Sequence, residues 1–131
     1  MIPITPVSRY NAMVNLRQGK ISREIFSSRE IYEEELEKVF TRAWLFVGHE
    51  SQIPNPGDFF ASRMGGESVI LARDKKKKVH VFLNSCRHRG MKVCQYDHGN
   101  TQLFTCPYHS WSFTTDGKLF GVPQFKTLYE G

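Results

Sequence analysis

The stretch CRHRGMKVCQYDHGNTQLFTCPYHSW, residues 86–111, has a pair of metal-binding side chains at each end. The first pair is Cys86 and His88, and the second pair is Cys106 and His109. Thiolates and imidazoles are common ligands of transition metals in proteins. If the two short segments fold side by side, two sulfur and two nitrogen ligands meet at one site.

The order of these ligands distinguishes two kinds of metal site. A zinc finger of the Cys2His2 type takes both cysteines from one turn, whereas each segment here supplies one cysteine and one histidine. In a Rieske 2Fe-2S centre two cysteines hold one iron and two histidines hold the other. The order therefore predicts a Rieske cluster and argues against a structural zinc module, which stays the non-redox alternative.

The composition is typical of one globular domain. The chain has 131 residues, of which 40% are hydrophobic and 24% are charged. No apolar run approaches the roughly 20 residues of a membrane span, and the N-terminal sequence lacks a signal pattern, so we expect a cytoplasmic protein without membrane contact. Three cysteines then favour metal chemistry over disulfides. The cysteine outside both pairs, Cys94, is interpreted as a small buried residue.

The positive charge of the chain is modest. The formal net charge is +5, and four of the 18 positive charges are the consecutive lysines Lys75 to Lys78. We interpret this run as a solvated hairpin turn, the alternative being a docking patch for an acidic partner. Nucleic acid is not an expected partner, because no basic helix accompanies the run.

The N-terminal third is expected to contain one helix. Residues 1–26 show no strong period and are predicted to form an extended arm. A capping box at Ser27 and Glu30 then predicts a helix over residues 27–43. Its apolar positions repeat at helical spacing, while the acidic residues lie on the other face.

Short strands separated by turns are expected after the helix. Their apolar runs are bounded by Pro, Gly, Asn and Asp residues. The expected strands are Trp44 to Val47, 59–64, 68–73, 79–84, 103–105, 111–114 and 118–120. They predict a mainly β fold, namely a small antiparallel sandwich or partly closed barrel with one N-terminal helix and two metal-binding loops. Gly90 and Pro107 suit such tight loops.

The two motifs together resemble a known family. Residues 86–90, CRHRG, and 106–111, CPYHSW, are similar to the Rieske domain of the alpha (large) subunit of bacterial aromatic-ring-hydroxylating dioxygenases. The resemblance covers roughly residues 20–123 and includes IPNPGD at 53–58. Ser110 departs from it, because the family more often has glycine there, which puts the local loop conformation in question.

The resemblance implies a cofactor and a domain plan. Cys86, His88, Cys106 and His109 are the implied ligands of a Rieske-type 2Fe-2S cluster. The implied Rieske domain is 44–123. Residues 124–131 then begin a connection to a catalytic domain, absent from this chain, that holds a mononuclear Fe(II). The chain is thus expected to be an excised or truncated domain that does not hydroxylate alone.

The implied function is one-electron transfer. In the family the electron comes from a ferredoxin or a reductase and passes through a cluster histidine to the mononuclear iron of a neighbouring alpha subunit. The resemblance also allows a beta subunit as a partner. The alternative is an independent Rieske-type ferredoxin that carries electrons between proteins. In the family the pocket for the aromatic substrate belongs to the catalytic domain.

Residues beside the ligands refine this expectation. Arg87 and Arg89 are expected to frame a docking surface, and Tyr108 and Trp111 to shield the cluster. High-potential Rieske proteins have a loop-to-loop disulfide and hydroxyl donors, for which this sequence has Met91, Tyr108, Trp111 and Phe113. A potential near the lower end of the Rieske range, about −150 mV, is therefore expected. His49, His80 and His98 are interpreted as surface or strand histidines.

Overall fold

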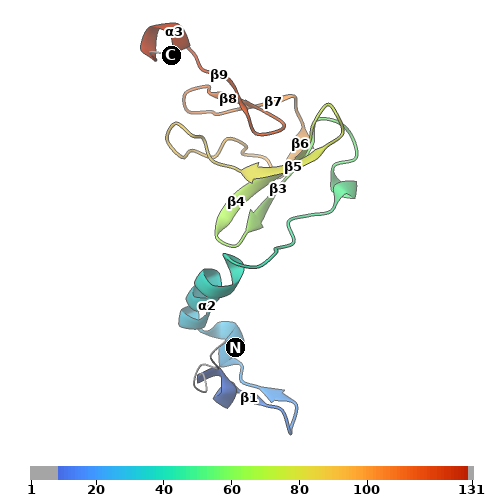
Figure 1. The fold of residues 1–131 in the computed structure, drawn as a ribbon, viewed down its shortest axis with the longest axis vertical. Helices are drawn as coiled ribbons and strands as arrows, with labels where there is room; N and C mark the ends of the chain where they lie inside the picture. The colour runs from blue at the N-terminus through green and yellow to red at the C-terminus, as the bar shows by residue number, and fades with distance from the viewer. Residues whose placement is uncertain (1–8, 130–131) are drawn as a thin grey trace, which may run out of the picture. The chain divides into compact units, whose positions relative to one another are not determined.

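The computed structural model describes residues 9–129 and divides the chain into two compact units, Met1–Trp44 and Leu45–Gly131 (Figure 1). The expectations for the first eight residues of the arm and for 130–131 of the connection lie outside the described residues. Within 9–129, none of the helices is both long and apolar enough to cross a membrane.

The first unit contains short helices and one small strand pair. Its elements are the 3-10 helix η1 (Arg9–Met13), strands β1 (Val14–Asn15) and β2 (Lys20–Ile21), helices α1 (Glu24–Ser27) and α2 (Arg29–Glu35), and the π-helix η2 (Leu36–Phe40). The strands β1 and β2 pair antiparallel. The described part of the predicted arm is therefore folded into a helical turn and a strand pair, and is not an extended chain.

The predicted capping box at Ser27 is wrong by one residue. Ser28 has an extended backbone and caps α2, because its side chain accepts a hydrogen bond from the Ile31 N–H at 3.4 Å. Ser27 instead ends α1. The carboxylate of Glu30 accepts a hydrogen bond from Arg9 at 2.8 Å instead of reaching back to the helix start. Two adjacent serines can cap a helix equally well, so the sequence does not distinguish them. The ion pair with Arg9 holds the Glu30 carboxylate away from the start of the helix.

The second unit is built from two antiparallel sheets. The first sheet has the order β5-β4-β3-β6, and the second has the order β7-β8-β9. The strands are β3 (Asp58–Met64), β4 (Glu67–Arg73), β5 (Val79–Leu83), β6 (His98–Asn100), β7 (Leu103–Thr105), β8 (Ser112–Thr114) and β9 (Leu119–Gly121). The 3-10 helix η3 (Glu50–Gln52) precedes them and the short helix α3 (Phe125–Leu128) follows them. The predicted mainly β, antiparallel fold is confirmed, and the described strands form no closed barrel.

Two strand predictions differ from the structure. The segment Trp44 to Val47 is not a strand, and Phe46 is largely exposed. Conversely, β6 has the sequence HGN, which carries no apolar pattern, and it is a strand because Asp58, Phe59 and Phe60 of β3 pair with it. Alternation of apolar residues makes a strand only where a partner strand supplies the hydrogen bonds.

The lysine run forms the turn between β4 and β5, as predicted. The carboxylate of Asp74 accepts hydrogen bonds from the N–H groups of Lys76 and Lys78, both at 2.8 Å. Its other oxygen lies 2.9 Å from His80 Nε2. The His80 contact is the main cause that lowers the pKa of Asp74. The turn is thus held by one carboxylate, while the lysine side chains are exposed.

The core lies where the two sheets meet. Phe104 of β7 contacts Phe59 of β3 edge to face, with ring centroids 5.2 Å apart, and Phe82 of β5 at 5.7 Å. The buried cluster consists of Phe59, Ile70, Ala72, Cys86, Val93, Cys94, Phe104, Cys106 and Phe113. All three cysteines of the chain therefore belong to the core. Cys86 follows β5 of the first sheet, and Cys106 follows β7 of the second sheet.

Candidate metal centre

The first motif forms a tight loop directly after β5. The N–H of Cys86 donates to the carbonyl of Met91 at 2.8 Å, and the N–H of Gly90 donates to the carbonyl of Cys86 at 2.8 Å. Gly90 has φ 73°, in the left-handed region that glycine enters without steric cost. These bonds close a loop that begins at the cysteine and contains His88.

The second motif, after β7, closes in the same way. The N–H of Cys106 donates to the carbonyl of Trp111 at 2.8 Å, and the N–H of Ser110 donates to the carbonyl of Cys106 at 2.9 Å. Ser110 has φ 59°, so it occupies the same position and the same conformation as Gly90 does in the first loop. With serine at position 110 the loop thus keeps the same conformation, but a residue with a side chain adopts the left-handed backbone.

This equivalence predicts opposite effects for two substitutions. Ser110→Gly should raise the free energy of unfolding by about 1 kcal/mol, because a non-glycine residue in the left-handed region costs about that much. Gly90→Ser should lower it by a similar amount, since an added Cβ would meet only Ser85 Oγ, at 4.0 Å, and the left-handed backbone is what resists the change. Urea unfolding of the two variants measures both values. Equal effects of the same sign would contradict the equivalence of the loops.

The two loops bring the four candidate ligands together. Cys86 and Cys106 are 3% and 1% exposed. The imidazoles of His88 and His109 lie with their ring centroids 4.6 Å apart, His88 half-buried and His109 exposed. The site therefore has its thiols in the core and its imidazole rings nearer the surface.

The chemistry of these side chains fits a metal cluster. His88 Nδ1 is buried and has no hydrogen-bond partner among residues 9–129, which is rare for a buried polar atom unless something else, such as a metal ion, takes its lone pair. Burial lowers the pKa of His88 and so favours the neutral imidazole that metals bind. Burial, assisted by the neighbouring Cys106, raises the pKa of the Cys86 thiol, so binding a metal there would displace a proton.

The ligand types match those of a Rieske cluster. A Rieske cluster takes only two protein ligands at each iron. One cysteine pair and one histidine pair match that requirement.

Each imidazole is covered by an aromatic ring of the second loop. Trp111 stacks on His88 with ring centroids 4.9 Å apart and planes 4° apart. Tyr108 lies against His109 with centroids 3.8 Å apart. Trp111 is half-buried and also packs on the core, whereas Tyr108 is largely exposed. The structure thus gives the two aromatic residues different positions, with Trp111 as an inner wall and Tyr108 on the surface.

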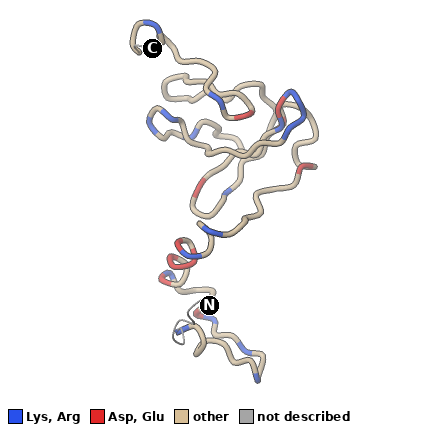
Figure 2. Tube along the Cα trace, in the orientation of Figure 1, with Lys and Arg blue, Asp and Glu red and all other residues tan. Residues whose placement is uncertain are grey.

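The surface around the first loop is positively charged. Arg87, Arg89 and Lys92 are exposed, and residues 85–95 contain no acidic side chain (Figure 2). The second loop, residues 103–112, has neither acidic nor basic side chains apart from His109. Positive charge therefore flanks the candidate ligands on the side of the first loop, and neither loop contains a carboxylate.

Asn84 is a residue of the site that sequence reasoning missed. It is 4% exposed and lies two positions before Cys86. Its Oδ1 accepts hydrogen bonds from the N–H groups of Val93 and Cys94, at 3.0 and 2.9 Å, and its Nδ2 donates to the Cys94 carbonyl at 2.8 Å. Asn84 thus fastens the returning chain to the start of the first loop. A polar residue at the end of an apolar strand was the available signal.

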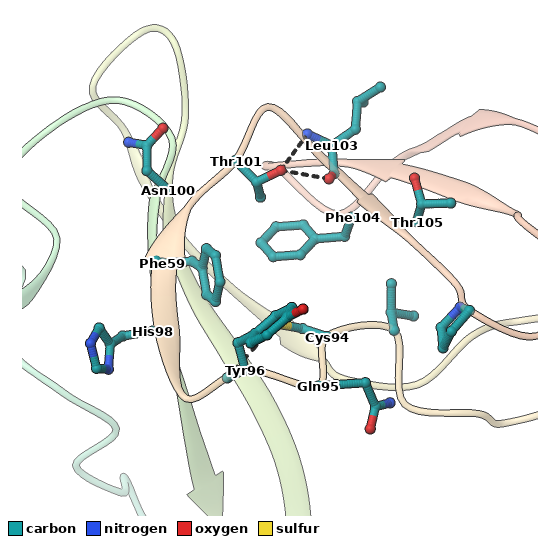
Figure 3. Close-up of a pocket in the computed structure, with 13 residues that line it drawn as sticks. Phe59, Cys94, Gln95, Tyr96, His98, Asn100, Thr101, Leu103, Phe104 and Thr105 are labelled. Carbon is teal, nitrogen blue, oxygen red and sulfur yellow. Dashed lines mark hydrogen bonds between the residues drawn. The ribbon is translucent and has the colours of Figure 1, made fainter.

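A hollow of about 500 Å³ lies behind the second loop (Figure 3). Phe59, Phe104, Tyr96 and Cys94 are among the residues that line it. Cys94 is 7% exposed and its thiol contacts the Tyr96 carbonyl at 3.4 Å. Burial raises the pKa of this thiol, which makes it less reactive. The interpretation of Cys94 as a small buried residue is confirmed.

The other three histidines lie elsewhere, as expected. His49 accepts a hydrogen bond from the Ser51 N–H at the start of η3. His80 is on β5 beside Asp74, and His98 is exposed on β6. None of them contacts the two metal-binding loops through a hydrogen bond described in residues 9–129.

Comparison with known proteins places this site in a family. A family model described as the Rieske [2Fe-2S] domain matches residues 43–130. The alpha subunit of biphenyl 2,3-dioxygenase from Rhodococcus jostii (strain RHA1) is 44% identical over 119 residues, which is 91% of this chain and 26% of that protein. Biphenyl dioxygenase subunit alpha from Metapseudomonas furukawaii is 48% identical over 117 residues, which is 89% of this chain and 26% of that protein.

Solved structures agree with the sequence relatives. A crystal structure of naphthalene 1,2-dioxygenase from Rhodococcus sp. bound to indole superimposes with a TM-score of 0.78 and 40% identity, covering 83% of this chain and 25% of that chain. The chain spans about a quarter of the length of the curated relatives it matches. With the family model covering most of its residues, the chain belongs to the Rieske [2Fe-2S] domain family.

Proposed function

We propose that Cys86, His88, Cys106 and His109 hold a Rieske 2Fe-2S cluster that carries one electron at a time. The observation that carries this proposal is the meeting of two buried thiols and two outward imidazoles in equivalent loops, with His88 Nδ1 left without a partner. When bound, the cluster supplies a one-electron redox centre.

The side chains around the ligands have separate tasks. Cys86 and Cys106 anchor the cluster in the core, where water is excluded. Trp111 covers His88 and keeps solvent from that ring. His109 is the exposed ligand, so it is the one that a partner protein can approach. Electron exchange with a partner is therefore expected at the His109 side.

We infer that the electron serves an oxygenase. Relatives named biphenyl and benzene dioxygenase alpha subunits match about nine-tenths of the chain, including most of the N-terminal unit. The proposed route runs from a ferredoxin or reductase, through this domain, to a mononuclear iron in the catalytic domain of a neighbouring alpha subunit. A beta subunit is a further proposed partner. The cytoplasmic location stays a prediction.

An independent Rieske-type ferredoxin is the second candidate. The domain fold alone supports both, since either protein needs the same two loops. The match of the alpha subunits beyond the Rieske region favours the oxygenase role, because it extends into residues that precede the family model. Electron transfer to a catalytic oxygenase subunit, but not to unrelated acceptors, would distinguish the two.

The proposed function is tested first by the metal itself. The purified chain should contain equal amounts of iron and acid-labile sulfide and should be coloured, and its reduced form should give an EPR signal with histidine nitrogen couplings. A colourless protein with bound zinc would overturn the proposal and support the structural zinc module.

The midpoint potential is predicted to be low, at about −150 mV. Met91 and Phe113 cannot donate hydroxyl hydrogen bonds, and no disulfide joins the two loops, because the three described cysteines are free. Fewer hydrogen bonds to a cluster stabilise its reduced form less. A redox titration followed by visible circular dichroism measures the midpoint, and a strongly positive value would contradict the prediction.

The donor is predicted to dock over His109 with the positive first loop inside the contact, because the rings of His109 and His88 lie only 4.6 Å apart. Replacing Arg87 and Arg89 together by glutamine should slow reduction by an acidic ferredoxin about tenfold at low salt, because complementary charge accelerates association. The difference should shrink at about 0.5 M salt, where charges are screened. Stopped-flow reduction kinetics measure both effects.

Lys75 and Lys76 provide the matched control. Replacing both by glutamine removes the same charge from the turn at the other end of β5. This control should leave the rate of reduction nearly unchanged. If the lysine variant were slowed as much as the arginine variant, the docking site would not be the metal-binding loop.

A further inference from the structure

A row of aromatic rings connects α3 with the metal-binding loops. Phe125 stacks on Tyr129 with centroids 6.0 Å apart and planes 18° apart. Tyr129 and Trp111 pack edge to face, with ring centroids 5.8 Å apart and planes at 79°. Trp111 in turn lies parallel to His88 at 4.9 Å. Four rings thus run from a segment after the last strand to a proposed ligand.

The path of the chain favours this contact. Gln124, just before α3, has φ 55° and ψ 29°, a left-handed conformation that costs free energy in a non-glycine residue. Phe125 and Leu128 of α3 are exposed, whereas Tyr129 is half-buried. Tyr129 is thus the residue at the end of α3 whose ring contacts Trp111.

We propose that Tyr129 is a positioning residue for His88, acting through Trp111. The Tyr129 ring, set at 79° to the indole, limits tilting of the indole, and the parallel indole limits rotation of the imidazole, because rotation would end the stacking. This inference rests on the proposed role of His88 as a cluster ligand.

The two proposed histidine ligands have separate partners. Trp111 stacks on His88, while the ring that lies against His109 is Tyr108. A change at Tyr129 should therefore shift the coupling of His88 more than that of His109, whose ring lies with its centroid 4.6 Å from that of His88. A general loosening of the domain would affect both equally.

Pulsed EPR of the reduced full chain resolves this difference, because it records a separate nitrogen coupling for each ligand histidine. Tyr129→Leu should shift one of the two couplings by more than its line width, and Trp111→Leu should shift the same one further. Tyr108→Leu should shift the other coupling. Tyr129→Phe, which keeps the ring, should restore the unaltered spectrum.

Phe120→Leu is the matched control, since it removes an exposed aromatic ring of β9 that is outside the row. It should leave both couplings unchanged, and circular dichroism should show that all variants are folded. An unaltered spectrum for Tyr129→Leu, or equal shifts of both couplings, would overturn the inference. If the unsubstituted protein shows no histidine couplings, the proposed function fails instead.

Discussion

Replacing Cys106 by alanine is expected to remove the 2Fe-2S cluster from the protein entirely. Cys106 is 1% exposed at the start of the second loop, and no other cysteine stands in that loop to replace it. A thiolate is the ligand that iron–sulfur clusters require at this position. The visible absorption and the iron content of the purified variant should both fall to background.

Cys94→Ala is the matched control for that experiment. Cys94 is also buried, so the same atoms are removed from the same core. The variant is expected to keep its iron and its spectrum, and to lose only about 1 kcal/mol of stability through the small cavity. Loss of the cluster from Cys94→Ala and its retention in Cys106→Ala would refute the proposed ligand set.

Replacing Asn84 by alanine is expected to destabilise the domain by at least about 3 kcal/mol. Three buried backbone groups, two N–H groups and one carbonyl, lose their hydrogen-bond partner, and each unsatisfied group costs about 1–3 kcal/mol. That loss is a large part of the total stability of a small domain, about 5–15 kcal/mol. Urea unfolding of the cluster-bound protein measures it, and faster release of iron should accompany it.

Gln95→Ala tests whether burial is the reason for the large loss of stability expected for Asn84→Ala. The Gln95 side chain also donates to a backbone carbonyl of this loop, that of Lys92 at 2.9 Å, but Gln95 is exposed. Water can replace that bond, so the expected loss is below about 1 kcal/mol. Similar losses for both variants would mean that the Asn84 hydrogen bonds have no special weight.

Most of the strands were predictable because their patterns are local. The strands 59–64, 68–73 and 103–105 have apolar runs bounded by turn residues, and the structure has strands there within a residue of those bounds. The helix cap was predicted at Ser27, whereas Ser28 is the cap. The two serines have the same side chain, and the sequence does not show that Glu30 pairs with Arg9. Strand β6 was missed because only its pairing with β3 defines it.

The candidate ligands were predictable, whereas their surroundings were not. The types and spacing of the four candidate ligands can be read directly from residues 86–109, so the sequence alone predicted a Rieske cluster. The sequence also predicted that Tyr108 and Trp111 lie near the site. It could not say which ring covers which histidine, because that depends on how two loops from different sheets meet.

The sequence by itself determined the family, the antiparallel strands and the four candidate ligands, because these depend on residue identity and short spacing. Tertiary structure alone decided that Asn84 fastens the first loop, that Ser110 takes the conformation of Gly90, and that Tyr129 reaches Trp111. The physical reason is that hydrogen bonds and ring contacts between distant segments depend on how the two sheets pack, and no local pattern encodes that packing.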